Sequence, residues 1–330
     1  MAGYKPYSEQ PHLHAQAPYR AAMLTYPGNL KKALRDAQED PAKTLFGVAH
    51  GIPSTFVTKL LASTKPDFIW IDVEHGMFNR LELHDAIHAA QTHSEGRALV
   101  IVRVPKQDEL SLTTALDAGA SGIVIPHVES AQEVKDMIKE MYYRSSPALP
   151  SKIPDMKTDN PQHPLATALS VRGLLRPADA SLYPNDMYNV ATSNNHVCII
   201  PQIESVKGVE NVEEIAAVPG VNALMFGPGD YMIDAGLDLS TALTGVPDPT
   251  MAKAMAKFGA AAQANDLPIF GGALSVDMVP MLIQQGFRAI AVQFDVWGLS
   301  KLIHGSLTQA RAAAQQVAAE SKEETNGAKA

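Results

Sequence analysis

The stretch Phe68-Ile69-Trp70-Ile71-Asp72-Val73-Glu74-His75-Gly76 is an apolar run that ends in three ionisable side chains. Its β-branched and aromatic residues are typical of a strand that is buried on both faces. Such a strand tolerates carboxylates and an imidazole only at its end, so we expect chemistry at its C-terminal end. The alternative is that Asp72 caps the following turn and that His75 is a surface histidine, since carboxylates also favour helix starts.

The same strand-like composition recurs along the chain, with helical patterns in between. The expected strands are centred near residues 46, 70, 101, 124, 200, 225, 269 and 291, and a helix-like segment follows each of them. Regular alternation of strands and helices implies right-handed crossovers and a parallel sheet. Eight such units close into a (β/α)8 TIM barrel. An open doubly wound sheet is the alternative, but no Gly-x-Gly-x-x-Gly follows the first strand.

A chain of 330 residues is of ordinary length for a single barrel domain. We predict an irregular N-terminal arm with a short helix at 1–40 and the barrel at 41–321. The barrel would carry a proline-rich insertion at 144–184, and a disordered tail would follow at 322–330. Early in the barrel, Ser54 is expected to begin a helix whose apolar face consists of Phe56, Val57, Leu60 and Leu61.

Composition excludes several classes of function. The formal net charge of -8 and the lack of a basic run argue against nucleic-acid binding. No run of 18 apolar residues is present, so no membrane span is expected. The first 40 residues lack the order of a signal peptide, and we expect a cytoplasmic protein, with a transit peptide as the alternative. The single cysteine, Cys198, lies in an apolar run and is expected to be a buried thiol rather than a nucleophile.

Polar residues gather at the ends of the expected strands. In a (β/α)8 barrel the active site is built at the C-terminal ends of the strands. The residues found at these ends are Asp72, Glu74, His75, Arg103, His127, Gln202, Glu204, Asp230, Gln293 and Asp295. This gathering favours a catalytic interpretation of Asp72 and His75 over simple capping.

Two of these acids, Glu204 and Asp230, follow neighbouring strands. Adjacent carboxylates repel each other unless a cation lies between them, and oxygen ligands with open positions suit Mg²⁺. We therefore expect a metal site, with helix capping as the alternative. The segment Gly227-Pro228-Gly229 would allow the N–H groups of Gly229 and Asp230 to approach a bound carboxylate, although it could also serve only as a turn.

The cationic residues narrow the chemistry further. Arg103 emerges from a buried strand and offers a fixed donor fork to a substrate oxygen, unless it forms a salt bridge with Asp72 or Glu74. Lys106 and Lys207 lie beyond strand ends, so no lysine is aimed into the barrel for a Schiff base. A metal-assisted mechanism is favoured over a covalent one.

Several ordered segments resemble the HpcH/HpaI aldolases, the divalent-metal class II pyruvate aldolases. The resemblance spans about residues 44 to 300, and the segments that carry it are Trp70–Gly76, Ile101–Pro105, Leu116–Pro126, Pro201–Ser205 and Phe226–Asp230. It implies a Mg²⁺ ion, or Mn²⁺ or another divalent cation, held by Glu204 and Asp230. It also assigns His75, oriented by Asp72, to acid/base work and Arg103 to the keto or enolate oxygen.

The resemblance also implies how substrates and subunits are arranged. Gln202 and the backbone of Gly229 and Asp230 would hold the pyruvyl part of a small 2-oxo acid, and Trp70 and Tyr188 would lie near a second, acceptor substrate. It further implies a homo-oligomer, a hexamer of barrels, in which the last helix is exchanged between subunits.

The activity expected from this reading is that of a Mg²⁺-dependent carbon–carbon lyase. It would generate pyruvate enolate by decarboxylating oxaloacetate or cleaving 4-hydroxy-2-oxo acids, and it could add the enolate to a 2-pyrone or aldehyde acceptor. Two alternatives stay open at the level of sequence. One is a thioester lyase of the malyl/citryl-CoA type, and the other is a non-catalytic oligomeric scaffold.

Overall fold

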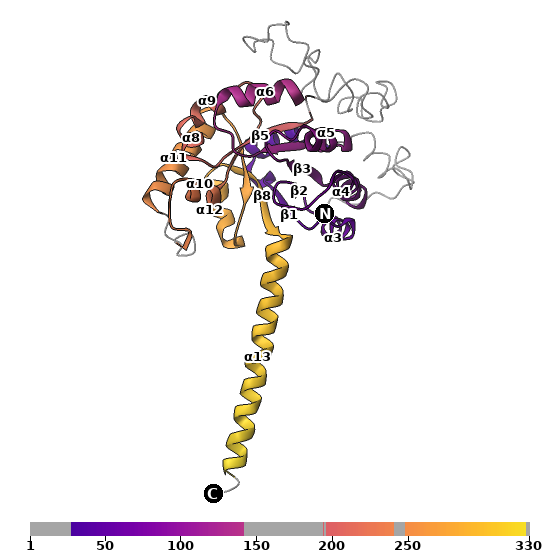
Figure 1. The fold of residues 1–330 in the computed structure, drawn as a ribbon, viewed down its shortest axis with the longest axis vertical. Helices are drawn as coiled ribbons and strands as arrows, with labels where there is room; N and C mark the ends of the chain where they lie inside the picture. Colours follow the sequence, from indigo (N-terminus) through magenta and orange to yellow (C-terminus); the bar gives the residue numbers. More distant parts are fainter. Residues whose placement is uncertain (1–27, 142–193, 195, 241–247, 328–330) are drawn as a thin grey trace.

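The strands form a closed parallel barrel. A computed structural model describes residues 28–141, 194, 196–240 and 248–327 (Figure 1). The strands pair in chain order from β1 to β8, and β8 pairs in parallel with β1 to close the ring. They are β1 (Leu45–His50), β2 (Phe68–Asp72), β3 (Leu99–Arg103), β4 (Gly122–Ile125), β5 (Cys198–Ile203), β6 (Leu224–Phe226), β7 (Ile269–Gly272) and β8 (Phe287–Phe294). The predicted (β/α)8 barrel is thus confirmed.

The described helices surround the barrel on its outer side, except that the first lies across its N-terminal end and the last extends away from it (Figure 1). They are α2 (Leu30–Glu39), α3 (Thr55–Ser63), α4 (Arg80–His93), α5 (Glu109–Ala118), α6 (Ala131–Met141), α8 (Val206–Glu210), α9 (Val212–Ala216), α10 (Pro228–Asp234), α11 (Pro249–Ala264), α12 (Val279–Gln284) and α13 (Asp295–Gly327). Two short 3₁₀ turns, η2 (Pro41–Lys43) and η5 (Val276–Met278), complete the described elements. Most of the predicted arm, the whole insertion at 144–184 and Tyr188 lie outside the described residues.

The core has two layers because side chains alternate along each strand. On β2, Phe68 and Trp70 point into the barrel, where they belong to the inner cluster. Ile69 and Ile71 point outward into the larger cluster between strands and helices. Leu30 of α2 joins the inner cluster from below, so this helix closes the N-terminal end of the barrel. The opposite, C-terminal end is left for the polar residues.

Side-chain caps fix where several helices begin. The Ser54 side chain accepts a hydrogen bond from the Val57 N–H and caps α3, as predicted. The predicted apolar face of α3 is wrong in part, since Phe56 is 68% and Leu60 51% exposed, whereas Leu61 packs against the core. The buried residues are instead Thr58 and Ala62. The Thr58 hydroxyl lies 2.8 Å from Nε2 of the buried His50, and this polar contact with β1 sets the rotation of the helix.

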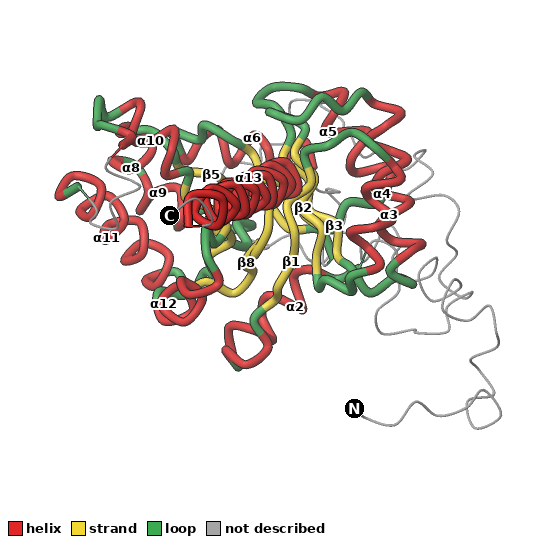
Figure 2. Tube along the Cα trace, turned by 90° about the horizontal axis from the view of Figure 1, so that it is seen from below, coloured by secondary structure: helices red, strands yellow, loops and turns green. Residues whose placement is uncertain are grey.

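The last helix, α13, leaves the barrel and extends away from it (Figure 1). Figure 2 shows this helix nearly end-on, beginning beside β1 and β8. It continues to Gly327, past residue 321, where we expected the disordered tail to begin. The Glu and Lys residues of that segment are good helix formers, which favours the continuation of the helix. No helix in the described ranges combines the length and apolarity needed to cross a bilayer.

The core packing predicts that a leucine-to-alanine substitution on α5 has a large effect on stability at a buried position and a small effect at an exposed one. Leu116 is fully buried and Leu110 is 60% exposed. Leu116→Ala should lower the free energy of unfolding by about 2–5 kcal/mol, because it leaves a cavity under the helix. Leu110→Ala should change it by about 0.5 kcal/mol or less. Urea unfolding followed by circular dichroism measures both, and equal losses would contradict this packing.

Candidate active site

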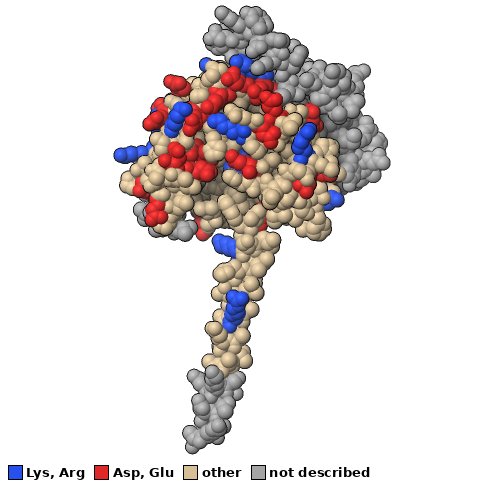
Figure 3. Space-filling model, viewed as in Figure 1, with Lys and Arg blue, Asp and Glu red and all other residues tan. Residues whose placement is uncertain are grey.

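Charged residues surround the C-terminal mouth of the barrel. Asp72 ends β2, Arg103 ends β3, Glu204 directly follows β5, and Asp230 lies in the first turn of α10, just after β6. Figure 3 shows acidic side chains crowded on the barrel, with basic side chains among them. Because all strands of the barrel are parallel, residues that follow the strands lie at the same end of the barrel, as predicted.

Arg103 is held by two acids. Its Nε donates to Asp72 Oδ1 at 2.9 Å, its Nη2 donates to Asp72 Oδ2 at 2.5 Å, and its Nη1 lies 3.2 Å from Glu74 Oε2. Burial disfavours the charged guanidinium, but the hydrogen bond and charge of Asp72, with the charges of Glu74 and Glu204, raise the pKa of Arg103 above its ordinary value. The salt-bridge alternative for Arg103 is thus present, and it makes the guanidinium a fixed cation at the mouth.

His75 is exposed, unlike the paired residues Arg103 and Asp72. Its side chain is 64% exposed, and Nε2 lies 3.9 Å from Glu74 Oε2. Asp72 Oδ1 contacts His75 through the backbone N–H, at 3.4 Å, while its carboxylate pairs with Arg103. In this geometry Asp72 orients Arg103 and the loop backbone rather than the imidazole. Gly76 permits the tight turn, because a Cβ there would lie 2.1 Å from the carbonyl oxygen of Asp72.

Glu204 is the most deeply buried acid of the site, at 2% exposure. Its Oε1 accepts a hydrogen bond from the His127 N–H at 2.7 Å, and its Oε2 accepts one from Gln202 Nε2. Burial raises the pKa of Glu204 to about 7, with further contributions from the charges of Asp230 and Glu74, while the His127 hydrogen bond opposes the shift. A buried carboxylate that faces a second one is the environment in which a cation is favourable.

The glycines of the β6–α10 turn have different roles. A Cβ on Gly227 would lie 2.3 Å from Glu204 Oε2 and 2.8 Å from Gln202 Nε2, so only glycine leaves room for this pair. A Cβ on Gly229 would meet nothing within 4 Å. The backbone of Gly229 therefore borders open space, as expected for a segment that a small anion approaches.

Aromatic rings line the barrel interior beneath Arg103. The Trp70 ring packs edge-on against Phe270 and Phe294, with ring centroids 5.2 and 5.9 Å apart, and Arg103 Cζ lies 5.4 Å from its centroid. Within the described part of the chain, the buried Trp70 Nε1 and Gln202 Oε1 have no hydrogen-bond partner. Unpaired buried groups of this kind are suited to a ligand. Both residues were predicted to bind substrate, and Trp70 lies inside the barrel beneath Arg103 while Gln202 lies beside Glu204.

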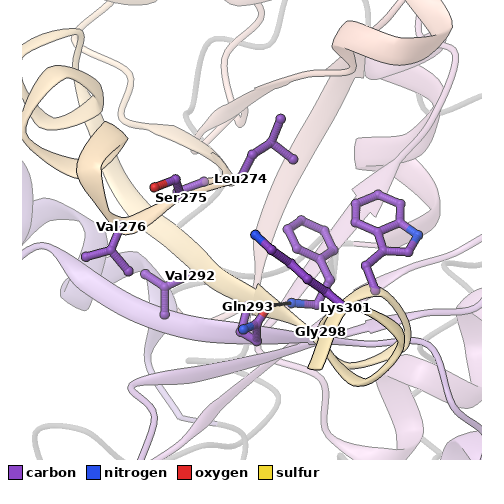
Figure 4. A pocket seen from close by; sticks show the side chains of 10 residues that line it. Leu274, Ser275, Val276, Val292, Gln293, Gly298 and Lys301 are labelled. Carbon is purple, nitrogen blue, oxygen red and sulfur yellow. Dashed lines mark hydrogen bonds between the residues drawn. The ribbon is translucent and has the colours of Figure 1, made fainter. Parts of the chain in front are cut away.

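A hollow of about 440 Å³ adjoins this aromatic layer (Figure 4). It lies where β7, β8 and the start of α13 meet, and Phe294 in its wall stacks on Trp297 with ring centroids 4.7 Å apart. Phe294 also contacts Trp70. The other lining residues are Ala273, Leu274, Ser275, Val276, Val292, Gln293, Gly298 and Lys301.

His127 is the site residue to which the sequence gave no role. Its Nδ1 lies 3.3 Å from Glu204 Oε1, and its Nε2 lies 3.3 Å from Glu74 Oε1. Its place after β4 was visible in the sequence, but its contacts depend on a backbone conformation that no pattern predicts. With His127 included, an unbroken set of polar contacts runs from Asp72 through Arg103 and Glu74 to Glu204.

A closed (β/α)8 barrel with paired acids, an arginine and two histidines at its C-terminal mouth has the architecture of an enzyme. The family model for HpcH/HpaI aldolase/citrate lyase matches residues 53–301, and the chain belongs to this family. It is accordingly an enzyme, a lyase of the aldolase type.

Individual relatives are similar to this chain over most of its length. A hydroxypyruvate/pyruvate aldolase of Paraburkholderia phytofirmans is 29% identical over 292 residues, covering 88% of this chain and 100% of the relative. A 4-hydroxy-2-oxovalerate aldolase of Novosphingobium aromaticivorans is 31% identical over 215 residues, covering 65% of this chain and 70% of the relative. The solved structure of macrophomate synthase is 71% identical, with a TM-score of 0.78, and the match covers 95% of this chain and 99% of that one.

The raised pKa of Glu204 predicts a specific dependence of stability on pH. A carboxyl group whose pKa is about 7 when folded, against an ordinary 4.5, stabilises the folded protein below pH 4.5 and loses that contribution as the pH rises through 7. Glu204→Gln should remove this loss, which amounts to roughly 3 kcal/mol. Urea unfolding with EDTA from pH 5 to pH 8 measures it as the difference between the wild type and the variant. A difference that does not change with pH would contradict the shift.

Proposed function

We propose that the chain is a Mg²⁺-dependent carbon–carbon lyase that generates pyruvate enolate. Its substrates would be oxaloacetate, which it decarboxylates, and 4-hydroxy-2-oxo acids, which it cleaves. The observation that carries this proposal is the buried Glu204 carboxylate at the barrel mouth, with Asp230 beside it and the fixed Arg103 near enough to act on its charge. The similarity to aldolases named for hydroxypyruvate, pyruvate and 4-hydroxy-2-oxovalerate supports the same substrate class.

The donors at Glu204 and Asp230 fit a hard divalent cation. Within residues 28–141, 194, 196–240 and 248–327, no three His, Cys, Asp or Glu side chains form a ligand group. A cation here would therefore rest on the two carboxylates, with substrate and water completing its coordination, as Mg²⁺ prefers. When bound, Mg²⁺ or Mn²⁺ would supply fixed positive charge for the oxygen on which negative charge develops.

Arg103 would stabilise the same developing charge. Its side chain is only 9% exposed, and Asp72 and Glu74 fix the direction of its guanidinium. A donor that is already oriented needs no reorganisation when the C2 oxygen of the substrate becomes an enolate oxygen, and such preorganisation is commonly a large term in catalysis. Asp72 is in this view a positioning residue for Arg103.

His75 would move the proton that aldol cleavage requires. In that reaction a base removes the proton of the 4-hydroxyl group, the C3–C4 bond breaks, and its electron pair forms the enolate. Decarboxylation breaks the equivalent bond with loss of CO₂ and needs no hydroxyl proton. The exposed His75, on the loop that follows β2, can approach a substrate that lies in the mouth.

The remaining predicted residues would bind the substrates. Gln202 and the backbone of Gly229 and Asp230 would hold the pyruvyl part, and Trp70 would face the acceptor. We assign Tyr188 to the acceptor side on sequence resemblance alone, because it lies outside the described residues. The similarity to macrophomate synthase supports a further addition of the enolate to a 2-pyrone, with aldehydes as the other acceptor class.

A pyruvate-release assay tests the function directly. Oxaloacetate and 4-hydroxy-2-oxo acids are supplied with Mg²⁺ or with EDTA, and pyruvate is measured by coupled reduction. We expect release that EDTA abolishes and Mg²⁺ restores, with no turnover of malyl-CoA or citryl-CoA. Metal-independent release would remove the proposed role of Glu204 and Asp230.

Two substitutions separate the role of the Arg103 guanidinium from that of His75 as the base. Arg103→Ala should reduce both decarboxylation and aldol cleavage by on the order of 10²-fold or more, because both form the same enolate. His75→Ala should reduce aldol cleavage selectively, since only that reaction moves a hydroxyl proton. Steady-state kinetics on both substrates gives the comparison, and equal modest losses in both variants would refute these assignments.

We also propose that the chain is a homo-oligomer, a hexamer in which α13 packs on a neighbouring subunit. Several large apolar side chains of α13 are exposed, because the helix stands away from its own barrel (Figure 1). They are Val296, Trp297, Leu299, Leu302, Ile303, Leu307 and Val317. Exposed apolar surface of this extent is typical of protein–protein contacts.

A charge placed on this apolar side of α13 should break the assembly. Leu302→Asp with Ile303→Asp is expected to lower the mass measured by light scattering, because it would bury two carboxylates in an apolar contact. Thr308→Asp, on the side of the helix that faces away from Leu302 and Ile303, serves as the control and should leave the mass unchanged. An undiminished mass for the double variant would contradict the exchange of α13.

A further inference from the structure

His127 joins two acids that belong to different parts of the site. Glu204 is a proposed metal ligand, and Glu74 is a partner of Arg103. One imidazole nitrogen of His127 lies 3.3 Å from Glu204 Oε1, and the other lies 3.3 Å from Glu74 Oε1. The two ring nitrogens therefore face one carboxylate each.

The backbone of His127 is fixed independently of its ring. Its N–H donates to Glu204 Oε1 at 2.7 Å, and its carbonyl oxygen accepts a hydrogen bond from Lys106 Nζ at 2.6 Å. Its φ of 53° lies in the left-handed region, which glycine adopts easily and which few other residues adopt. The chain keeps an imidazole where glycine would fit the backbone better.

We propose that His127 is a positioning residue whose ring ties Glu74 to Glu204 and so fixes the metal carboxylate relative to Arg103. This inference rests on the proposed function, since it concerns a ligand of the proposed cation. The ring would hold one oxygen of Glu204 while Gln202 holds the other, leaving the remaining lone pairs to face Asp230. Groups that orient metal ligands from outside typically change metal affinity 10- to 100-fold when they are replaced.

At this position the ring can be removed without disturbing the backbone. His127→Gly removes the ring but retains the backbone N–H to Glu204, in a conformation that glycine adopts without strain. His127→Asn restores a short donor and tolerates the left-handed region. Gln107→Gly is the matched control, because Gln107 is also a non-glycine residue in this region, with a φ of 64°, in the neighbouring loop after β3.

The readout is Mg²⁺ binding by the full chain without substrate, followed as the rise of the unfolding temperature with Mg²⁺ concentration. His127→Gly should weaken Mg²⁺ binding by about 10-fold or more. His127→Asn should recover most of the affinity, and Gln107→Gly should match the wild type. Glu74→Gln removes the other end of the link and should weaken binding in the same direction. The double variant with His127→Gly should lose no more than His127→Gly alone.

Pyruvate release adds a second readout, which separates positioning from catalysis. In His127→Gly the Mg²⁺ concentration for half-maximal activity should rise by the same factor as the dissociation constant, while the rate at saturating Mg²⁺ should change little. A fall in that rate with unchanged Mg²⁺ affinity would overturn the positioning role. Equal Mg²⁺ affinity in wild type and His127→Gly would overturn this inference alone. No Mg²⁺ binding by the wild type would overturn the metal-dependent function as well.

Discussion

The burial of one carboxylate, that of Glu204, is the constraint around which the mouth of the barrel is organised. Water cannot solvate this group, so the protein supplies a backbone N–H from the loop after β4, a side-chain amide from β5 and open space at Gly227. These donors do not fully compensate for the burial, which is why the pKa remains raised. A buried acid with a raised pKa is suited to a nearby positive charge, and the second acid and the fixed guanidinium would complete the setting for the enolate chemistry that we propose.

Much of the fold followed from local patterns, because buried parallel strands and capped helices leave strong signals in sequence. The strand at Phe68–Asp72 and the Ser54 cap are examples, and the strand ends placed Asp72, Arg103, Glu204 and Asp230 at one mouth. The partners within that mouth were harder to predict. The carboxylate of Asp72 meets Arg103 rather than the ring of His75, because β2 and β3 are adjacent and set these two residues side by side.

The other differences from expectation have the same origin in tertiary contacts. The α3 helix turns its Thr58 inward because the buried His50 needs a polar neighbour, so Phe56 faces outward. The role that we propose for His127 depends on a left-handed backbone conformation that a one-dimensional pattern does not reveal. In both cases contacts between elements, and not the local sequence pattern, decide where the side chain lies.

Asp295 begins α13 and also holds the end of β1, where it accepts hydrogen bonds from the N–H groups of Gly51 and Ile52 and lies 2.7 Å from Nδ1 of His50. The helix is therefore clamped at its root, and it continues directly from β8. Asp295 therefore acts as a pivot, and a force on the far end of α13 would be transmitted through it. The force would first reach β1 and β8, the two strands that close the barrel.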